Sequence, residues 1–475
     1  MLGKHSVIYF LGRGLPGIIN FLAMSIYTRL VAPNEYGKYS IIFATVMLMT
    51  MIFYQWIRLT LLRFLPKATN PEEEGQLFAS VFIGFLVSGL LSILFLGVYL
   101  IFFKNQYSMV LLGGGILLLW LQSLYEIGLE YFRSNLKVKR YSIINFIRSI
   151  LALLFGAFFS YLGFGANGLI LGLNISIVLI ISIYYRSVLL KMFKSIKFFN
   201  KTAFFSHMSY GVPLTASYAM SYVFNTSDRF FIQHYVGAAS TGIYSVGYDL
   251  SKQTLWVIMM SINLASYPLV LRALEAKEFV KANEQLKSYL LILIAISFPA
   301  AFGLAFLAKP ITSILIGKSY SSEVAIIVPY ISIGALIAGL KAYYIDLSFH
   351  LSKRSWMQLW SVSISAVINI ALNFILIPRI GIMGAVYSSV ICYTVDFLIS
   401  AYLTTKCFAL PVPWLNVGKL VLSTGVMVIV ILLIKPVLSG PIGLAIIITV
   451  GGLIYLLLLF LFRLVNFKKI IGQFK

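Results

Sequence analysis

Residues 441–462 read PIGLAIIITVGGLIYLLLLFLF and contain no charged side chain. A helix needs roughly 20 mostly apolar residues to cross the hydrocarbon core of a bilayer, so this stretch is predicted to span a membrane. The whole chain has the same character, because 60% of its 475 residues are hydrophobic and only 11% are charged. Soluble globular domains carry about 25% charged residues. We therefore expect one integral membrane domain.

Similar apolar segments recur along the chain and are separated by mostly short links. They predict an all-α integral membrane protein with about 14 transmembrane helices. The expected segments are 7–28, 39–62, 78–102, 109–132, 142–161, 165–185, 209–233, 242–266, 289–308, 326–349, 356–377, 382–404, 418–435 and 441–462.

The distribution of lysine and arginine predicts the orientation. With a cytoplasmic N-terminus, 24 of the 37 basic residues fall on inner segments and 7 on outer links. Cytoplasmic loops carry such an excess of positive charge. Both termini are therefore expected on the cytoplasmic side of the membrane. The membrane itself is expected to be the inner membrane of a bacterial cell. The net charge of +23 follows from this topology, so we expect no nucleic-acid partner, although the basic face also suits anionic lipid.

An internal repeat predicts two similar halves. VAPNEYGKYS at 31–40 and VGAASTGIYS at 236–245 share a valine and Gly-x-Tyr-Ser at the same spacing, and GANG at 165–168 is echoed by GIMG at 381–384. Halves of six spans keep the same orientation and relate by an axis along the membrane normal. The expected division is an N-lobe at 1–205 (helices 1–6 and an inner linker), a C-lobe at 206–405 (helices 7–12), and two further helices and a cytoplasmic tail at 406–475.

Charged residues inside the predicted spans are the candidates for function, because charge in a membrane is costly and usually faces a cavity or another charge. The cations are Arg13, Arg58, Arg148, Arg229, Lys252 and Lys341, and the acids are Glu126, Glu130, Asp228, Asp249, Asp346 and Asp396. Arg13 lies two turns into the first span beside Gly12, Gly14 and Pro16. This predicts a bent helix and a guanidinium that binds phosphate in a cavity, with snorkelling to the surface as the alternative.

The other charges leave two interpretations open. Arg58 and Arg148 either line a cavity or snorkel, and Asp249 and Lys252 are spaced to form an ion pair. Asp228 and Arg229 do not share a helix face, so one is a candidate gate and the other a ligand. Glu126 and Glu130 form either a proton-binding carboxylate pair or a cluster neutralised by the inner basic loop. Three deeper residues are candidates for ion coupling: Lys341, Asp346 and Asp396.

Several motifs resemble those of the O-antigen flippases, which belong to the superfamily of multidrug, oligosaccharidyl-lipid and polysaccharide exporters. They are GRGLP at 12–16, P-x-EYG-x-YS at 33–40, WIR at 56–58, YGVP at 210–213, DRFFI at 228–232 and GIYSVGY at 242–248. The resemblance covers about the first 270 residues in motif and the whole chain in span count.

The resemblance implies two six-helix lobes around a central cavity and a polyprenyl-diphosphate oligosaccharide as substrate, flipped from the cytoplasmic to the outer leaflet by alternating access. The substrate-binding cations would be Arg13, Arg58, Arg229 and Lys252, and residues for coupling or gating would be Asp228, Asp249, Glu126, Asp346 and Asp396. Partners would be the lipid bilayer and other membrane proteins of polysaccharide assembly.

Other functions are weighed by charge and loop length. A multidrug cation antiporter of the same superfamily would need a cavity dominated by acids, whereas cations and acids are balanced here. A membrane-embedded glycan polymerase or ligase would need a large outer loop, but the outer links are short. We therefore expect a transporter rather than an enzyme. The isolated histidines and cysteines predict no metal site, no cofactor is expected, and transport is expected to couple to H⁺ or Na⁺.

Overall fold

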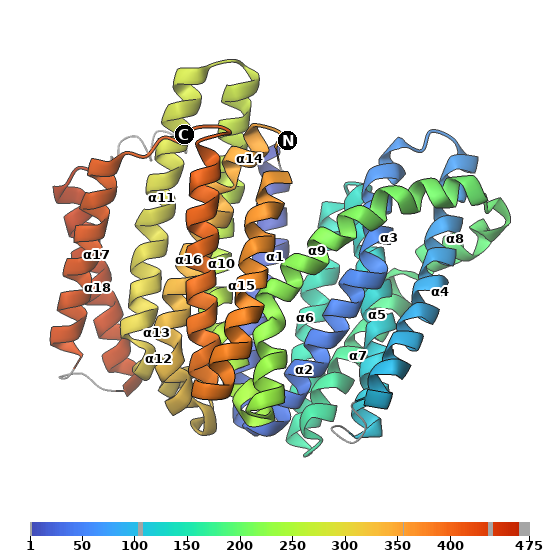
Figure 1. Ribbon diagram of the computed structural model, residues 1–475, viewed down its shortest axis with the longest axis horizontal. Helices are drawn as coiled ribbons and strands as arrows, with labels where there is room; N and C mark the ends of the chain where they lie inside the picture. The colour runs from blue at the N-terminus through green and yellow to red at the C-terminus, as the bar shows by residue number, and fades with distance from the viewer. Residues whose placement is uncertain (1, 103–107, 355, 436–439, 465–475) are drawn as a thin grey trace. The chain divides into compact units, whose positions relative to one another are not determined.

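The computed structural model describes residues 2–102, 108–354, 356–435 and 440–464, with side chains described from residue 14 onward except at 95–102 and 217. Within these ranges all regular structure is helical (Figure 1). The chain divides after Gly242 into two compact units, unit 1 and unit 2.

Unit 1 is built from long helices joined by short turns. Its elements are α1 (Leu2–Leu30), α2 (Pro33–Met49), the π-helical turn η1 (Thr50–Tyr54), α3 (Gln55–Phe64), the short 3-10 turn η2 (Leu65–Lys67), α4 (Pro71–Phe102), α5 (Met109–Ser134), α6 (Val138–Tyr161), α7 (Gly165–Tyr184), α8 (Arg186–Lys194), the 3-10 turn η3 (Ser195–Phe198) and α9 (Lys201–Tyr235).

Unit 2 begins within the first turns of α10. Its elements are α10 (Ala238–Glu275), α11 (Phe279–Phe306), α12 (Ala308–Leu315), α13 (Lys318–Leu340), the π-helical turn η4 (Lys341–Ile345), α14 (Leu347–Leu351), α15 (Trp356–Ile380), α16 (Ile382–Thr404), α17 (Trp414–Ile434) and α18 (Gly440–Leu461).

The helices have the length and composition of membrane spans. Each of the fourteen predicted segments lies within one or more helices, to within a residue or two. Twelve helical segments of the described chain are long and apolar enough to cross a membrane. The long helices α1 and α9 are not in that set, so the number of fourteen spans is not confirmed. Large apolar side chains remain exposed, such as Leu433 (71%) and Ile442 (77%). In a protein with this composition, such side chains face lipid.

Several buried tyrosines in the two units donate their hydroxyl hydrogen to a backbone carbonyl. In unit 1, Tyr185 donates to the carbonyl oxygen of Tyr125 over 2.9 Å and Tyr27 to that of Ala152 over 2.8 Å. In unit 2, Tyr455 donates to that of Ala295 over 2.8 Å. Without water to pair them, buried hydroxyls need such partners.

The second sequence echo is visible in the backbone of both units. Gly165 is the first residue of α7 and Gly381 directly precedes α16, with φ of +50° and +59°, which glycine adopts at low cost. Three residues later, a Cβ on Gly168 would lie 2.9 Å from the backbone of Phe159, and one on Gly384 would lie 2.6 Å from the backbone of Leu376. The α6–α7 and α15–α16 hairpins therefore share one close-packed geometry.

The helix α9 packs within unit 1. Figure 1 shows that it bends along its length, and Pro213 lies inside it, where the missing N–H permits a kink. The hydroxyl of Thr60 on α3 donates to the carbonyl oxygen of His207 over 3.2 Å, and that of Tyr222 donates to the carbonyl oxygen of Ala44 on α2 over 3.2 Å. The lobe boundaries at 205 and 405 stay a prediction.

Candidate functional site

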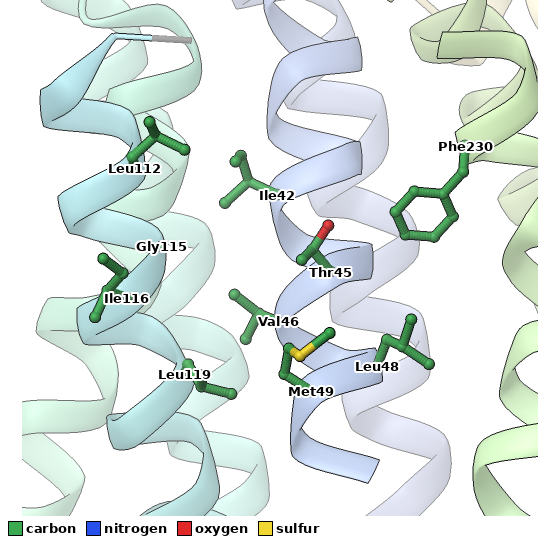
Figure 2. A pocket seen from close by; sticks show the side chains of 10 residues that line it. All are labelled: Ile42, Thr45, Val46, Leu48, Met49, Leu112, Gly115, Ile116, Leu119 and Phe230. Atoms are coloured by element: carbon green, nitrogen blue, oxygen red, sulfur yellow. The ribbon is translucent and has the colours of Figure 1, made fainter. Parts of the chain in front are cut away.

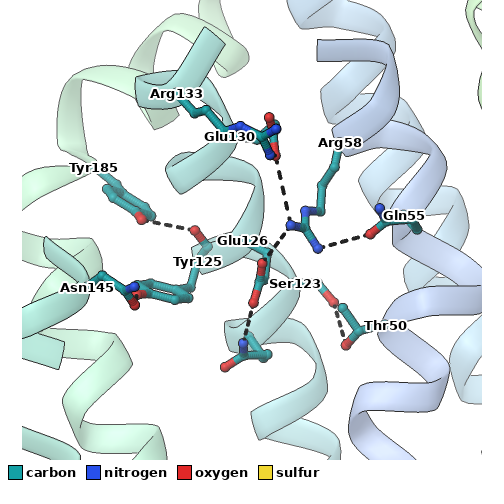
Figure 3. A network of polar contacts seen from close by, with 11 residues as sticks. Thr50, Gln55, Arg58, Ser123, Tyr125, Glu126, Glu130, Arg133, Asn145 and Tyr185 are labelled. Atoms are coloured by element: carbon teal, nitrogen blue, oxygen red, sulfur yellow. Dashed lines mark hydrogen bonds and ion pairs between the residues drawn. The ribbon is translucent and has the colours of Figure 1, made fainter. Parts of the chain in front are cut away.

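An ion-pair network joins α3 to α5 inside unit 1 (Figure 3). The guanidinium of Arg58 lies 3.0 Å from the Glu126 carboxylate and 3.9 Å from that of Glu130. It also donates to the Gln55 side chain over 2.9 Å. The Glu130 carboxylate in turn lies 3.5 Å from Arg133. Arg58 is therefore held in place by carboxylates on the neighbouring helix.

The network continues from α5 to α6 through an amide. Gln122 donates to Glu126 over 2.8 Å and accepts from Arg148 over 3.1 Å. The Arg148 guanidinium also lies 5.3 Å from the ring centre of Tyr125, and its Nε is buried without a hydrogen-bond partner. In the part of the chain that the structure describes, no carboxylate pairs with Arg148.

Local helix geometry explains why these side chains meet. Gln122, Glu126 and Glu130 follow one another at intervals of four, so they form a stripe along one face of α5. Between α2 and α3, the π-helical turn η1 adds a residue and rotates the following helix by about 100°. At this turn Thr50 Oγ1 lies 3.5 Å from Ser123 Oγ on α5.

An apolar pocket lies between α2 and α5 (Figure 2). Its cavity volume is about 210 Å³. Side chains of α2 and α5 face it, and Phe230 of α9 completes the lining. Met49 and Leu119 line one end of the pocket. Met49 is next to Thr50 in the sequence, and Leu119 lies one turn before Ser123 on α5. The apolar pocket and the polar network therefore occupy consecutive turns of α5.

The structure places the other predicted residues of unit 1 on α1 and α9. Asp228 is buried, and Arg229 donates to the hydroxyl of Ser40 on α2 over 3.3 Å. Their roles as gate and ligand stay predictions. Arg13 lies on α1, but its side chain lies outside the described part of the structure, so its phosphate contact also stays a prediction.

In unit 2, aromatic rings surround Lys252 on α10. Its ammonium donates to the Tyr248 hydroxyl over 2.5 Å, and Tyr248 shares a 2.8 Å hydrogen bond with Tyr393 of α16. The ammonium also lies 5.7 Å from the ring centre of Trp256. Asp249 is half-buried on the same helix, and its expected ion pair with Lys252 stays a prediction.

A second charged cluster in unit 2 consists of Lys341, Asp346 and Asp396. The Lys341 ammonium lies 3.3 Å from Asp346 Oδ2 and 3.2 Å from Asp396 Oδ2. Gln358 of α15 donates to Asp346 Oδ2 over 2.9 Å. All three charged residues are buried, with exposed fractions of 5% or less.

The structure therefore gathers several predicted residues into two sets, one around Arg58 and Glu126 and one around Asp346 and Asp396. It adds the connecting amides Gln55, Gln122 and Gln358, which have no charge to draw attention to them in the sequence. The spacing of Gln122 four residues before Glu126 was the available signal for one of them. Among the described residues, no group of three or more His, Cys, Asp or Glu is arranged to hold a metal ion.

Comparison with known proteins places this arrangement in a known fold. The structure is similar to the lipid II flippase MurJ in an inward closed conformation, with a TM-score of 0.79 and 18% identity, over 96% of this chain and 99% of that one. It is similar to an inward-facing multidrug resistance transporter of the MATE family, with a TM-score of 0.63 and 13% identity, over 87% and 98% of the two chains.

A third similar structure is a transporter of the MOP superfamily from Pyrococcus furiosus, with a TM-score of 0.56 and 13% identity, over 84% of this chain and 94% of that one. No curated protein matches the sequence. The chain thus has the fold of the MurJ and MATE transporters and is a multi-pass membrane protein. A family model described as "Polysaccharide biosynthesis protein" matches residues 26–325. The chain belongs to this polysaccharide biosynthesis family.

Proposed function

We propose that this protein is a flippase that moves a polyprenyl-diphosphate oligosaccharide from the cytoplasmic to the outer leaflet of the bacterial inner membrane. Membership of a polysaccharide biosynthesis family supports a glycan precursor as substrate. Similarity in fold to a lipid II flippase supports transport of a lipid-linked substrate. Two lobes alternate access to the substrate, both termini lie in the cytoplasm, and the substrate is an O-antigen or similar repeat unit. The protein acts as a transporter, without an enzymatic step.

The observation that carries this proposal is the excess of positive charge in the unit 1 network. The network contains three guanidinium groups, on Arg58, Arg133 and Arg148, and two carboxylates, on Glu126 and Glu130. Arg148 is the cation whose charge no carboxylate balances within the described residues. A guanidinium matches the geometry of phosphate oxygens and forms charge-assisted hydrogen bonds with them. An anionic diphosphate would supply the missing negative charge.

The neighbouring apolar pocket suits the rest of such a substrate. Its lining is apolar apart from the Thr45 hydroxyl and the backbone. On α5 the network begins at Gln122, about one turn beyond the pocket residue Leu119. In a molecule with a charged head group and a long isoprenoid tail, the head group would match the polar network and the tail would match the apolar pocket. The head group loses its hydration in the membrane, which costs several kcal/mol for each charge unless protein groups replace it.

Transport of a defined probe tests this proposal. Purified protein in proteoliposomes should flip a fluorescent polyprenyl-diphosphate oligosaccharide, as followed by quenching of the probe left in the outer leaflet. Arg148→Gln removes one charge-assisted hydrogen-bond donor group, worth about 1.5–3 kcal/mol, so flipping at low probe concentration should fall about tenfold or more. Arg148→Lys should restore part of the rate because the charge remains.

The matched control is Arg140→Gln, which removes an arginine from the exposed start of the same helix and should leave the rate unchanged. Equal rates for Arg148→Gln and wild type would contradict the assignment of the head-group site. Absence of flipping by wild-type protein, together with drug resistance in cells that express it, would instead favour a multidrug antiporter.

A further inference from the structure

The cluster of Lys341, Asp346 and Asp396 lies at an irregular point of the fold. In a regular α-helix, side chains five residues apart are separated by about 140° around the axis. Lys341 and Asp346 nevertheless meet, because η4 widens the helix by one residue and the Asp346 amide bonds the Lys341 carbonyl oxygen over 2.9 Å. Turns of this π type often occur at functional sites.

The charges of this cluster do not cancel. One ammonium faces two carboxylates, so the fully ionised cluster carries one net negative charge. Asp346 and Asp396 each use Oδ2 for the contact with Lys341, while Oδ1 of each is buried and has no hydrogen-bond partner among the described residues. Burial of an anionic oxygen without a hydrogen-bond partner costs free energy, and a proton on that oxygen would remove the charge.

The charged and titratable neighbours come from every element around the cluster. Lys341 belongs to η4, Asp396 to α16, and His350 of α14 follows Asp346 by one turn and interacts electrostatically with Lys341. The side chain from α15 is the neutral Gln358. The ammonium already occupies the position between the two carboxylates, so a metal cation there would be repelled. A proton, in contrast, can add to either unpaired Oδ1 atom.

We propose that Lys341, Asp346 and Asp396 form a site that holds one exchangeable proton, shared between the two carboxylates. Loading the site makes the cluster neutral, and releasing the proton leaves one buried negative charge. The neutral, protonated cluster therefore favours an apolar environment around η4 and α16, and the charged, deprotonated cluster favours a polar one. The role of this proton site in driving transport rests on the proposed flippase function, whereas proton binding at the site does not.

The position of Asp396 connects this site to Lys252. Tyr393 precedes Asp396 by three residues, so both lie on one face of α16. Tyr393 shares a hydrogen bond with Tyr248, which accepts from the Lys252 ammonium. A movement of α16 on proton release would thus change the support of a cation that the family resemblance assigns to substrate binding.

Infrared spectroscopy of purified protein tests proton binding without any substrate. Wild-type protein should show the high-frequency carbonyl band that distinguishes a buried protonated carboxylic acid from hydrated surface acids. This band should disappear as pH rises, and Asp346→Asn and Asp396→Asn should each lose it. Lys341→Gln should instead double the band, because both carboxylates must then be protonated. The control is Ser400→Ala, one turn beyond Asp396. It removes a neutral hydroxyl that donates to the Ser361 hydroxyl over 2.9 Å, and it should keep the wild-type band.

Absence of a titrating band from wild-type protein, or its persistence in both aspartate variants, would overturn the proposal. The wild-type titration decides even where a variant does not fold. Transport supplies the separate test of coupling: an imposed proton gradient should accelerate flipping of the fluorescent probe several-fold in wild type and not in Asp396→Asn. Acceleration by a sodium gradient alone would overturn coupling through this site. Failure of wild type to flip the probe would refute the flippase function and leave the infrared result standing.

Discussion

Gly37 and Gly242, the equivalent glycines of the two sequence repeats, pack against each other's helix backbone. A Cβ on Gly37 would lie 1.7 Å from the carbonyl oxygen of Ala238, and a Cβ on Gly242 would lie 2.2 Å from that of Pro33. The Cβ of either would lie 3.0 Å from the backbone nitrogen of the other glycine. The repeated Gly-x-Tyr-Ser motif therefore marks a close helix crossing, where small residues let backbones approach.

Substitution of Gly37 by alanine should destabilise the protein. The added methyl group meets backbone atoms, which cannot rotate away, so we expect a loss of about 1–3 kcal/mol or more, as for other overpacked positions. Thermal unfolding of purified protein in detergent measures the change. Gly113→Ala is the matched control, since a Cβ there has no neighbour within 4 Å, and it should leave stability equal or slightly higher. Equal unfolding temperatures for both variants would contradict the crossing.

The ion pair between Arg58 and Glu126 should contribute through coupling rather than through either charge alone. Both side chains are mostly buried, with 18% and 17% exposed. Removing one partner leaves the other charge uncompensated, which in buried pairs costs up to about 3–5 kcal/mol. Arg58→Gln and Glu126→Gln should therefore each destabilise the protein, and the double variant should recover part of the loss. A double-mutant cycle on unfolding free energies should give about 0.5–3 kcal/mol of coupling. Additive losses would show that the pair is not coupled.

The sequence predicted one part of unit 1's network, the pair of carboxylates on α5, because that part has regular helix geometry. Glu126 and Glu130 are four residues apart on α5, and the regular helix places them on one face. The partner of Glu126 was harder to find, because Arg58 comes from another helix and its direction depends on the π turn η1. No local pattern indicates which of several arginines reaches a given carboxylate.

In unit 2 the spacing of the charged residues along the sequence did not indicate that they meet. Lys341 and Asp346 do not share a face of an ideal helix, and they meet only because η4 is a π turn. Asp396 joins them from α16, across a large separation in sequence. The sequence thus identified these residues as buried charges, but their assembly depends on a backbone irregularity and on tertiary packing.

Filling the apolar pocket should slow transport without unfolding the protein. Ile116 on α5 lines the pocket (Figure 2), and Ile116→Phe would occupy space that we assign to the isoprenoid tail. Excluding two methylene groups costs about 1.6 kcal/mol at about 0.8 kcal/mol each, so flipping of the probe should fall about tenfold. The control Leu117→Phe enlarges a residue that is 48% exposed on the same helix. An equal rate for both variants would show that the tail does not use this pocket.

The orientation predicted from the basic loops can be tested with single cysteines in unit 2. Glu284, at the start of α11, lies in a predicted inner segment, and Ser319, at the start of α13, lies in a predicted outer link. Both side chains are exposed, so each cysteine should react with a maleimide that does not cross membranes. In a Cys407→Ser background, Ser319→Cys should be labelled in intact spheroplasts and Glu284→Cys only in inside-out vesicles. The native Cys392, which is fully buried, should remain unlabelled in both. In the predicted orientation the cytoplasmic loops carry the excess of lysine and arginine. The reverse labelling pattern would contradict this orientation and would place both termini outside the cytoplasm.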